Sequence, residues 1–182
     1  VPTGDFVVVK FARWAFEKFK GVEDKLGTQM RAVGEVMSIG KTYKEAFQKA
    51  IRSLETGRPG LGHAKDFDSL SKEELLRRLH TPSSERHFMM YEALRKGATV
   101  EEIHQITKVK HWFISQMQEL VMDLEDLDHI LSHMKLLGSK GTTGTQASFL
   151  ELFDGDEEAC KKADKMIAEK MGFEACFPVS GQ

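Results

Sequence analysis

Hydrophobic and polar positions follow two different periods along this chain. Two runs rich in β-branched residues, 5–10 and 31–39, lie within the first forty residues and predict β-strands. From residue 42 onward, apolar residues recur every three or four positions, which is typical of amphipathic helices. Helices are expected from 42 to just before Gly57, and over 71–80, 83–96, 100–107, 109–136 and 156–171. The pattern predicts an α+β fold that is predominantly α-helical.

Capping residues support these helix boundaries. Three Ser or Thr residues stand three positions before a Glu, in the spacing of a capping box: Thr42 with Glu45, Ser71 with Glu74, and Thr99 with Glu102. Gly97, Gly138 and Gly172 follow predicted helices in the position of a C-terminal glycine. The Gly/Pro-rich segment 57–62 is the best candidate for a domain boundary in the first half of the chain.

The predicted helix 109–136 is long and carries a regular apolar seam. Its length is roughly 40 Å at 1.5 Å per residue. Steps of four and three residues alternate along the seam, as at the a and d positions of a coiled coil. Such a seam packs against another helix, either in the same chain or in a second copy, so a homo-oligomer is expected. The seam residues are Phe113, Met117, Leu120, Leu124, Leu127, Leu131 and Met134.

Composition and charge exclude several classes of protein. The 182 residues carry a formal net charge of −2, which argues against a nucleic-acid partner and against an anionic membrane surface. No uninterrupted apolar run approaches 18 residues, so no transmembrane helix is expected. The two cysteines, Cys160 and Cys176, are too few for a disulfide framework and match no zinc pattern. A cytoplasmic location is therefore expected.

Three segments contain residue types that could support chemistry. Gly40-Lys41-Thr42 lacks the spacing of a phosphate loop and fits the end of a strand leading into a capped helix. His129 and His133 are spaced by four but lack the zincin Glu, so a solvated helix surface is expected and no metal site. Within the loop 140–146, glycines allow close backbone approach, and the hydroxyls of Thr142 and Thr143 could meet an anionic group.

The first two thirds of the chain, about 4–119, resemble the large subunit of carbamoyl-phosphate synthetase. The resemblance lies in Val7–Phe19, in Leu26–Thr42, and in the segments 46–55, 92–97 and 112–113, with Ala12 in place of the family's usual proline. It implies the C-terminal remnant of an ATP-grasp domain over 1–57 and a helical oligomerisation domain over 58–119. That family is an ATP- and Mg-dependent ligase of arginine and pyrimidine biosynthesis. Its metal and nucleotide carboxylates lie upstream of the matched segment, so no cofactor is expected here.

The remainder, about 120–182, resembles adenylosuccinate lyase of the fumarase/aspartase superfamily, an enzyme of purine biosynthesis. The resemblance lies in Met122–Leu127, Gly141–Phe153, Glu169–Phe173 and Pro178–Gln182. It implies substrate contacts at Thr142, Thr143, Gln146 and Gln182. The lyase family's general-acid histidine and catalytic serine loop lie outside this segment, so no catalytic residue is assigned.

Two resemblances meeting near residue 120 suggest a fragment or a chimera. The leading hypothesis is a non-catalytic chain that associates through the seam from Phe113 to Met134, with itself or with other chains of the parent enzyme. The alternative is a part of an adenylosuccinate lyase whose active site is completed by other chains. In a third interpretation, the chain only binds a ligand, and the loop Gly141–Gln146 has affinity for a phosphate or dicarboxylate.

Overall fold

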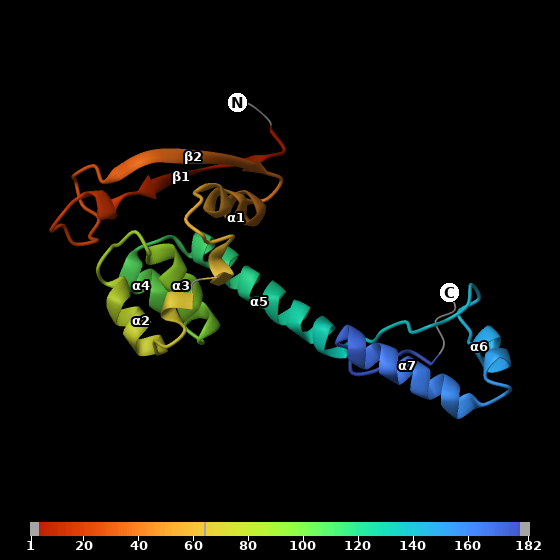
Figure 1. Cartoon of the computed structure of the whole chain (residues 1–182). Helices are drawn as coiled ribbons and strands as arrows, with labels where there is room; N and C mark the ends of the chain where they lie inside the picture. The colour runs from red at the N-terminus through yellow and green to blue at the C-terminus, as the bar shows by residue number, and fades with distance from the viewer. Residues whose placement is uncertain (1–3, 64, 179–182) are drawn as a thin grey trace. The chain divides into compact units, whose positions relative to one another are not determined.

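The computed structural model describes residues 4–63 and 65–178 (Figure 1). The fold is predominantly helical with a two-stranded antiparallel sheet, which confirms the predicted α+β class. The chain divides into two compact units, unit 1 over residues 1–125 and unit 2 over 126–182. The division falls within one long helix.

The sheet of unit 1 consists of β1 (Val7–Trp14) and β2 (Ala32–Gly40). Antiparallel pairing runs from Val7 opposite Gly40 to Trp14 opposite Ala32, with a register shift between Ala12 and Trp14. Side chains alternate across the two faces, so Phe11 is buried while Lys10, on the opposite face, is exposed. β1 is longer than the predicted strand 5–10, because pairing with β2 continues through Trp14.

Helix α1 (Tyr43–Ser53) packs on one face of this sheet (Figure 1). The Thr42 hydroxyl accepts the Glu45 N–H at 3.2 Å, as the predicted N-cap requires. The Glu45 carboxylate accepts the Lys41 N–H at 2.8 Å, so the cap is a variant of the reciprocal box. The residues of α1 that enter the core are Ala46, Phe47, Ala50 and Ile51.

Three further helices complete the centre of unit 1: α2 (Lys72–Leu79), α3 (Arg86–Arg95) and α4 (Val100–Thr107). Thr99 forms the full predicted capping box, since its hydroxyl accepts the Glu102 N–H and its own N–H donates to the Glu102 carboxylate. α3 begins three residues later than predicted, because Ser84 is held in the preceding turn by the carboxylate of Asp24. Short 3-10 helices lie at Phe16–Lys18, Leu61–His63 and Lys65–Phe67.

The Gly/Pro segment 57–62, expected from the sequence to separate two domains, lies inside unit 1. Leu61 is fully buried there and belongs to the same apolar core as Phe47 and Phe88. The segment is a turn between parts of one core. Its glycines and proline allow the chain to turn here, and the segment does not link two separate domains.

Helix α5 (His111–His133) is the predicted long helix, shorter by two residues at its start and three at its end. In unit 1 its buried residues are Ile114, Met117 and Val121. Phe113 and Leu120, two members of the predicted seam, lie at the margin of this buried face. Met117 is buried as the seam predicts, but Ile114 and Val121, which the seam leaves out, are also buried, and Phe113 is exposed.

Unit 2 contains the end of α5, α6 (Ala147–Leu152) and α7 (Glu157–Met171). α7 matches the prediction: Asp156 caps its start, and Gly172 ends it in the left-handed conformation at φ 80°. A short parallel bridge joins Leu136 and Cys176. α6 was not predicted, because it has only six residues and no side-chain cap.

Candidate functional site

The first half of α5 is fixed firmly to α1. The Tyr43 ring lies 5.2 Å from the Trp112 ring and 5.4 Å from the Phe113 ring, centroid to centroid. The Lys44 ammonium pairs with Glu119 at 3.1 Å and Asp123 at 3.2 Å, and these hydrogen bonds raise the pKa of Lys44. Burial raises the pKa of Tyr43 to about 12. These contacts join the first half of α5 to α1 within unit 1.

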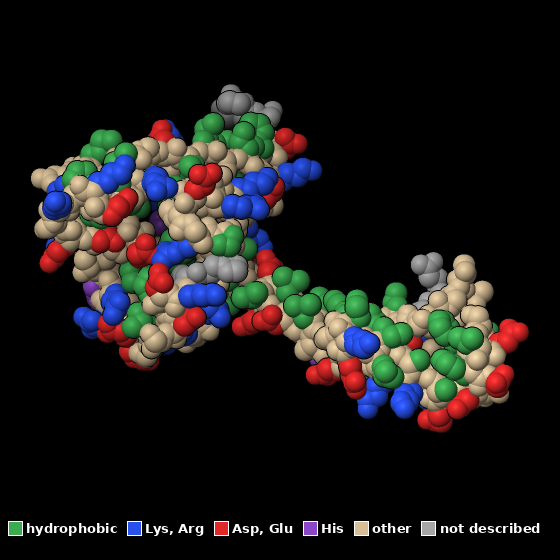
Figure 2. Space-filling view, viewed as in Figure 1, with side chains coloured by type: hydrophobic (Ala, Val, Ile, Leu, Met, Phe, Trp, Pro, Cys, Tyr) green, Lys and Arg blue, Asp and Glu red, His purple; other side chains and the backbone are tan. Residues whose placement is uncertain are grey.

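Past Glu125, the apolar face of α5 is bare. Leu127, Ile130 and Leu131 follow the spacing i, i+3, i+4 and so share one face of α5, and Met134 is the first residue after the helix. Their exposed fractions are 56%, 57%, 60% and 46%. We call these four residues the α5 stripe. Figure 2 shows hydrophobic side chains gathered along this part of the helix.

The opposite side of the helix is polar. Glu125 and Asp128 are exposed there, and Asp123 and Asp126, which lie nearer the stripe, are exposed as well. The rings of His129 and His133 lie 4.4 Å apart, and Nδ1 of His133 contacts the His129 carbonyl at 2.9 Å. Among the described residues, no group of three or more His, Cys, Asp or Glu side chains is arranged to hold a metal ion.

The rest of unit 2 is also poorly covered. Its buried side chains on α7 are Cys160, Asp164 and Ala168. Large apolar side chains are exposed at several further positions of this unit, namely Leu137, Leu152, Met166, Ile167, Met171 and Phe177. Exposed large apolar side chains in this number are typical of protein interaction sites. The arrangement suits association through burial of this surface.

The loop 140–146 forms a turn closed by its own backbone. The Gly141 N–H donates to the Thr145 carbonyl at 2.7 Å, and the Gly144 N–H donates to the Gly141 carbonyl at 2.8 Å. Thr142 and Thr143 are exposed. Gln146 is half-buried, donates to the Ser139 carbonyl at 3.4 Å, and borders a hollow of about 260 Å³. Gln182, the remaining predicted contact, lies outside the described residues.

An ion pair that the sequence pattern did not predict lies beside this loop. The Lys140 ammonium donates to the carboxylate of Asp164, and the two side chains are only 3% and 10% exposed. The same carboxylate accepts the Ser139 N–H at 2.9 Å. The signal was present in the sequence, because Asp164 lies four residues from Cys160 and four from Ala168 on the buried face of α7.

The Gly40-Lys41-Thr42 segment is the strand end and capped helix start that the sequence predicted. A Cβ atom at Gly40 would lie 2.8 Å from the backbone nitrogen of Ala46, so the strand and helix approach too closely for a side chain there. None of the helices in the described ranges has an apolar stretch that could cross a membrane.

Comparison with known proteins gives a consistent result. Residues 35–168 match the family model of the carbamoyl-phosphate synthetase large chain, oligomerisation domain. The carbamoyl phosphate synthase large chain of Archaeoglobus fulgidus is 47% identical over 135 residues, which are 74% of this chain and 12% of that protein. The large chain of Synechocystis is 49% identical over 120 residues, covering 66% of this chain and 11% of that protein.

A third relative covers nearly the whole chain. The N-terminal section of the carbamoyl phosphate synthase large chain of Methanopyrus kandleri is 37% identical over 181 residues, 94% of this chain and 30% of that protein. This alignment and the family match both continue well past residue 120, where the sequence pattern suggested a change to a lyase. The lyase segment and the chimera therefore have no support from these comparisons. The chain spans less than a third of the length of these three relatives.

Proposed function

Because the chain belongs to the family of carbamoyl-phosphate synthetase large chain oligomerisation domains, we propose that it acts by helix-mediated self-association through the α5 stripe. The observation that carries this proposal is the stripe itself, three apolar side chains on one face of α5 and a fourth directly after the helix, each about half exposed. Apolar surface of this extent is stabilised by burial against a partner. A second copy of the chain presents the same surface, which allows a symmetric interface.

The role proposed for this chain is non-catalytic. The parent activity, an ATP-dependent ligase reaction, is proposed only for the larger proteins of which such domains are part. The two thiols, Cys160 and Cys176, are both free, which agrees with the proposed cytoplasmic location. Turnover of ATP, or cleavage of adenylosuccinate, by the purified chain would overturn the non-catalytic part of the proposal.

Light scattering coupled to size-exclusion chromatography tests the association directly. We expect the wild-type chain to elute with a mass that is a multiple of 20.6 kDa. Replacing Leu127 and Leu131 with Lys places two charges in the centre of the stripe and should weaken association by about 100-fold or more. A wild-type chain that remains monomeric at high concentration would overturn the proposal.

Met122 provides a matched control. It lies on the same helix and is 57% exposed, but its position relative to Leu127 places it on another face. Met122→Lys introduces the same charge on a similarly exposed residue, so it should leave the mass unchanged. If Met122→Lys weakens association as much as the stripe double variant does, the stripe is not the interface.

A further inference from the structure

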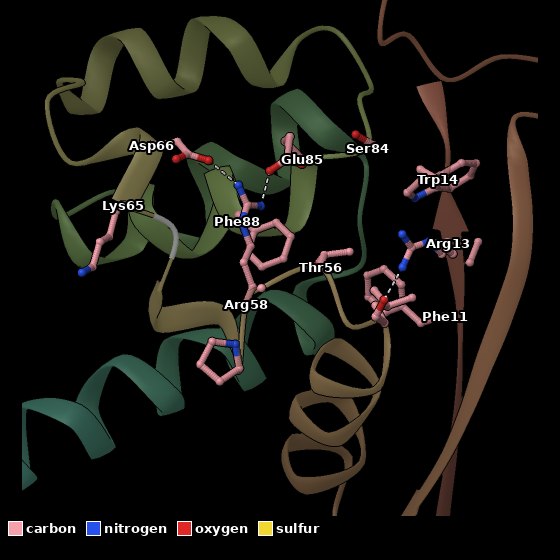
Figure 3. Close-up of a pocket in the computed structure, with 14 residues that line it drawn as sticks. Phe11, Arg13, Trp14, Thr56, Arg58, Lys65, Asp66, Ser84, Glu85 and Phe88 are labelled. Atoms are coloured by element: carbon pink, nitrogen blue, oxygen red, sulfur yellow. Dashed lines mark hydrogen bonds and ion pairs between the residues drawn. The ribbon is translucent and has the colours of Figure 1, made fainter. Parts of the chain in front are cut away.

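A polar hollow in unit 1 is not used by the proposed association. Its volume is about 590 Å³, within the range of small-molecule sites. It lies between the end of β1 and the segments that precede α2 and α3, and Figure 3 shows its lining side chains. All lining residues belong to unit 1, so the hollow is formed within one compact body.

The irregular end of β1 lines this hollow with four consecutive residues, Phe11, Ala12, Arg13 and Trp14. In a regular strand, neighbouring side chains point to opposite faces. The pairing register shifts between Ala12 and Trp14, and both Arg13 and Trp14 line the hollow. Bulges of this kind occur preferentially next to functional sites, where they redirect a side chain. In Figure 3 the Arg13 guanidinium points toward Thr56 across the hollow.

Arg58, which lines the hollow opposite Arg13, already has two carboxylate partners. The Arg58 guanidinium pairs with Asp66 at 2.5 Å and also with Glu85, and it lies 4.1 Å above the ring of Phe88. These contacts satisfy its charge and fix its position. Arg58 therefore lines the hollow without being available to bind an anion, and recognition of a ligand depends on Arg13 and its neighbours.

The Arg13 side keeps free donors. Arg13 gives one N–H to the Leu54 carbonyl at 2.6 Å, and a guanidinium has five such donors. Lys65 also lines the hollow, and within the described part of the chain it is in no ion pair. The Ser84 hydroxyl donates to Asp24 at 2.6 Å, so it is engaged elsewhere. The remaining donors favour an anion near Arg13.

The backbone beside Arg13 is held in an uncommon conformation. Glu55 has φ 52° and Gly57 has φ 81°, both in the left-handed region. For Glu55 this region is unfavourable, because a Cβ atom crowds the backbone there. The two residues flank Thr56, whose side chain borders the hollow. Glu55 directly follows Leu54, the C-cap of α1, so its left-handed conformation ends the helix and brings Thr56 to the hollow.

We propose that this hollow binds a small planar molecule carrying a phosphate or carboxylate group. The Arg13 guanidinium and the Thr56 hydroxyl take the anionic group, because a guanidinium matches the paired oxygens of such anions. The indole of Trp14 stacks on the planar part. The hollow is separate from the α5 stripe, which lies in unit 2, so either proposal can fail without the other.

Tryptophan fluorescence of the full chain tests this site. The chain has two tryptophans, Trp14 and Trp112, so Trp112→Phe leaves Trp14 as the reporter. Four probes distinguish the contribution of the anionic group from that of the planar ring: phenyl phosphate, benzoate, inorganic phosphate and phenol. We expect phenyl phosphate or benzoate to change the Trp14 emission saturably, and the better of the two to bind at least about tenfold more tightly than inorganic phosphate or phenol.

Variants in the same Trp112→Phe background test the residues. Arg13→Gln should weaken binding about tenfold. Arg13→Lys should weaken it less, because Lys keeps the positive charge but lacks the paired N–H donors of a guanidinium. Thr56→Val tests the second donor without touching the bond from Arg13 to the Leu54 carbonyl. Arg52→Gln removes the same charge from an exposed position of α1 outside the hollow and should change nothing.

Three results would overturn the proposal. The first is no saturable change with any probe, and the second is equal affinity for all four probes. The third is an affinity that Arg13→Gln and Thr56→Val both leave unaltered. Binding of benzoate alone would assign the site to carboxylates, and binding of phenyl phosphate alone would assign it to phosphates.

Discussion

His87 is an ionisable residue placed in apolar surroundings. Its ring lies 5.1 Å from the ring of Phe11 and 5.5 Å from the ring of Phe47, centroid to centroid. Burial among these rings, and to a smaller degree the charge of Arg86, lowers the pKa of His87 from 6.5 to about 4. His87 therefore joins the sheet to α1 and α3 as a neutral, largely apolar side chain at neutral pH.

The lowered pKa predicts a loss of stability in mild acid. Between pH 6.5 and pH 4 the unfolded chain binds a proton on His87 that the folded chain does not, so the free energy of unfolding falls as the pH falls. The loss is complete below pH 4 and amounts to at most about 3 kcal/mol. Urea unfolding at a series of pH values, in wild type and in His87→Phe, measures it.

His87→Phe keeps a ring in contact with Phe11 and Phe47 but cannot titrate. Between pH 6.5 and pH 4, the free energy of unfolding of the wild type should therefore fall steadily relative to that of the variant. Carboxylates titrate in both proteins and cancel in the difference. A difference that is constant over this range would show that His87 is protonated in the folded state.

At the scale of elements, the Lys140–Asp164 pair joins the segment after α5 to α7. Asp164→Asn removes the partner of a buried ammonium while keeping the shape of the side chain, so it should destabilise unit 2 by about 3 kcal/mol or more. Hydrogen exchange of the α7 backbone amides measures the change within this unit.

The double variant Lys140→Met with Asp164→Asn separates the lost pair from the stranded charge. Without the ammonium, the unpaired buried charge is gone, so the double variant should protect the α7 amides better than Asp164→Asn alone. Equal exchange in the single and double variants would mean that the Lys140 ammonium reaches solvent when its partner is removed.

The sequence predicted those elements best whose signals are local. Thr99 and Ser71 start their helices where the pattern places them, because an N-cap acts on backbone groups only three residues away. The phase of α5 could not be predicted, because burial of Ile114 rather than Phe113 depends on α1 and its aromatic residues. The hollow at Arg13 could not be predicted either, since it forms only where β1 and the segment after α1 meet in space.

The candidate association surface was partly predictable. The seam residues Leu127, Leu131 and Met134 follow the helical period, and they are the residues that the structure leaves exposed. Ile130 belongs to the same face but falls outside a strict a/d seam. Which half of the seam is buried within the chain depends on tertiary contacts of α5, and these cannot be read from the period.

At the scale of the whole molecule, the two units differ in how well each is packed. Unit 1 has a continuous apolar core that extends from Phe11 to Val121. Unit 2 buries few side chains, and several of its largest apolar residues are exposed. A unit that buries little apolar surface opens readily, and covering that surface with a partner raises the free energy of opening.

Opening of unit 2 should therefore depend on protein concentration if the α5 stripe is the interface. Raising the concentration about 100-fold through the association range raises the free energy of opening by up to about 2.7 kcal/mol. Hydrogen exchange of amides in α7 should slow accordingly, whereas amides in α3, at the centre of unit 1, should not change. The Leu127→Lys, Leu131→Lys double variant should abolish the dependence, and Met122→Lys should retain it. If α7 exchanges at one rate over the whole range while light scattering shows association, the chains meet through another surface.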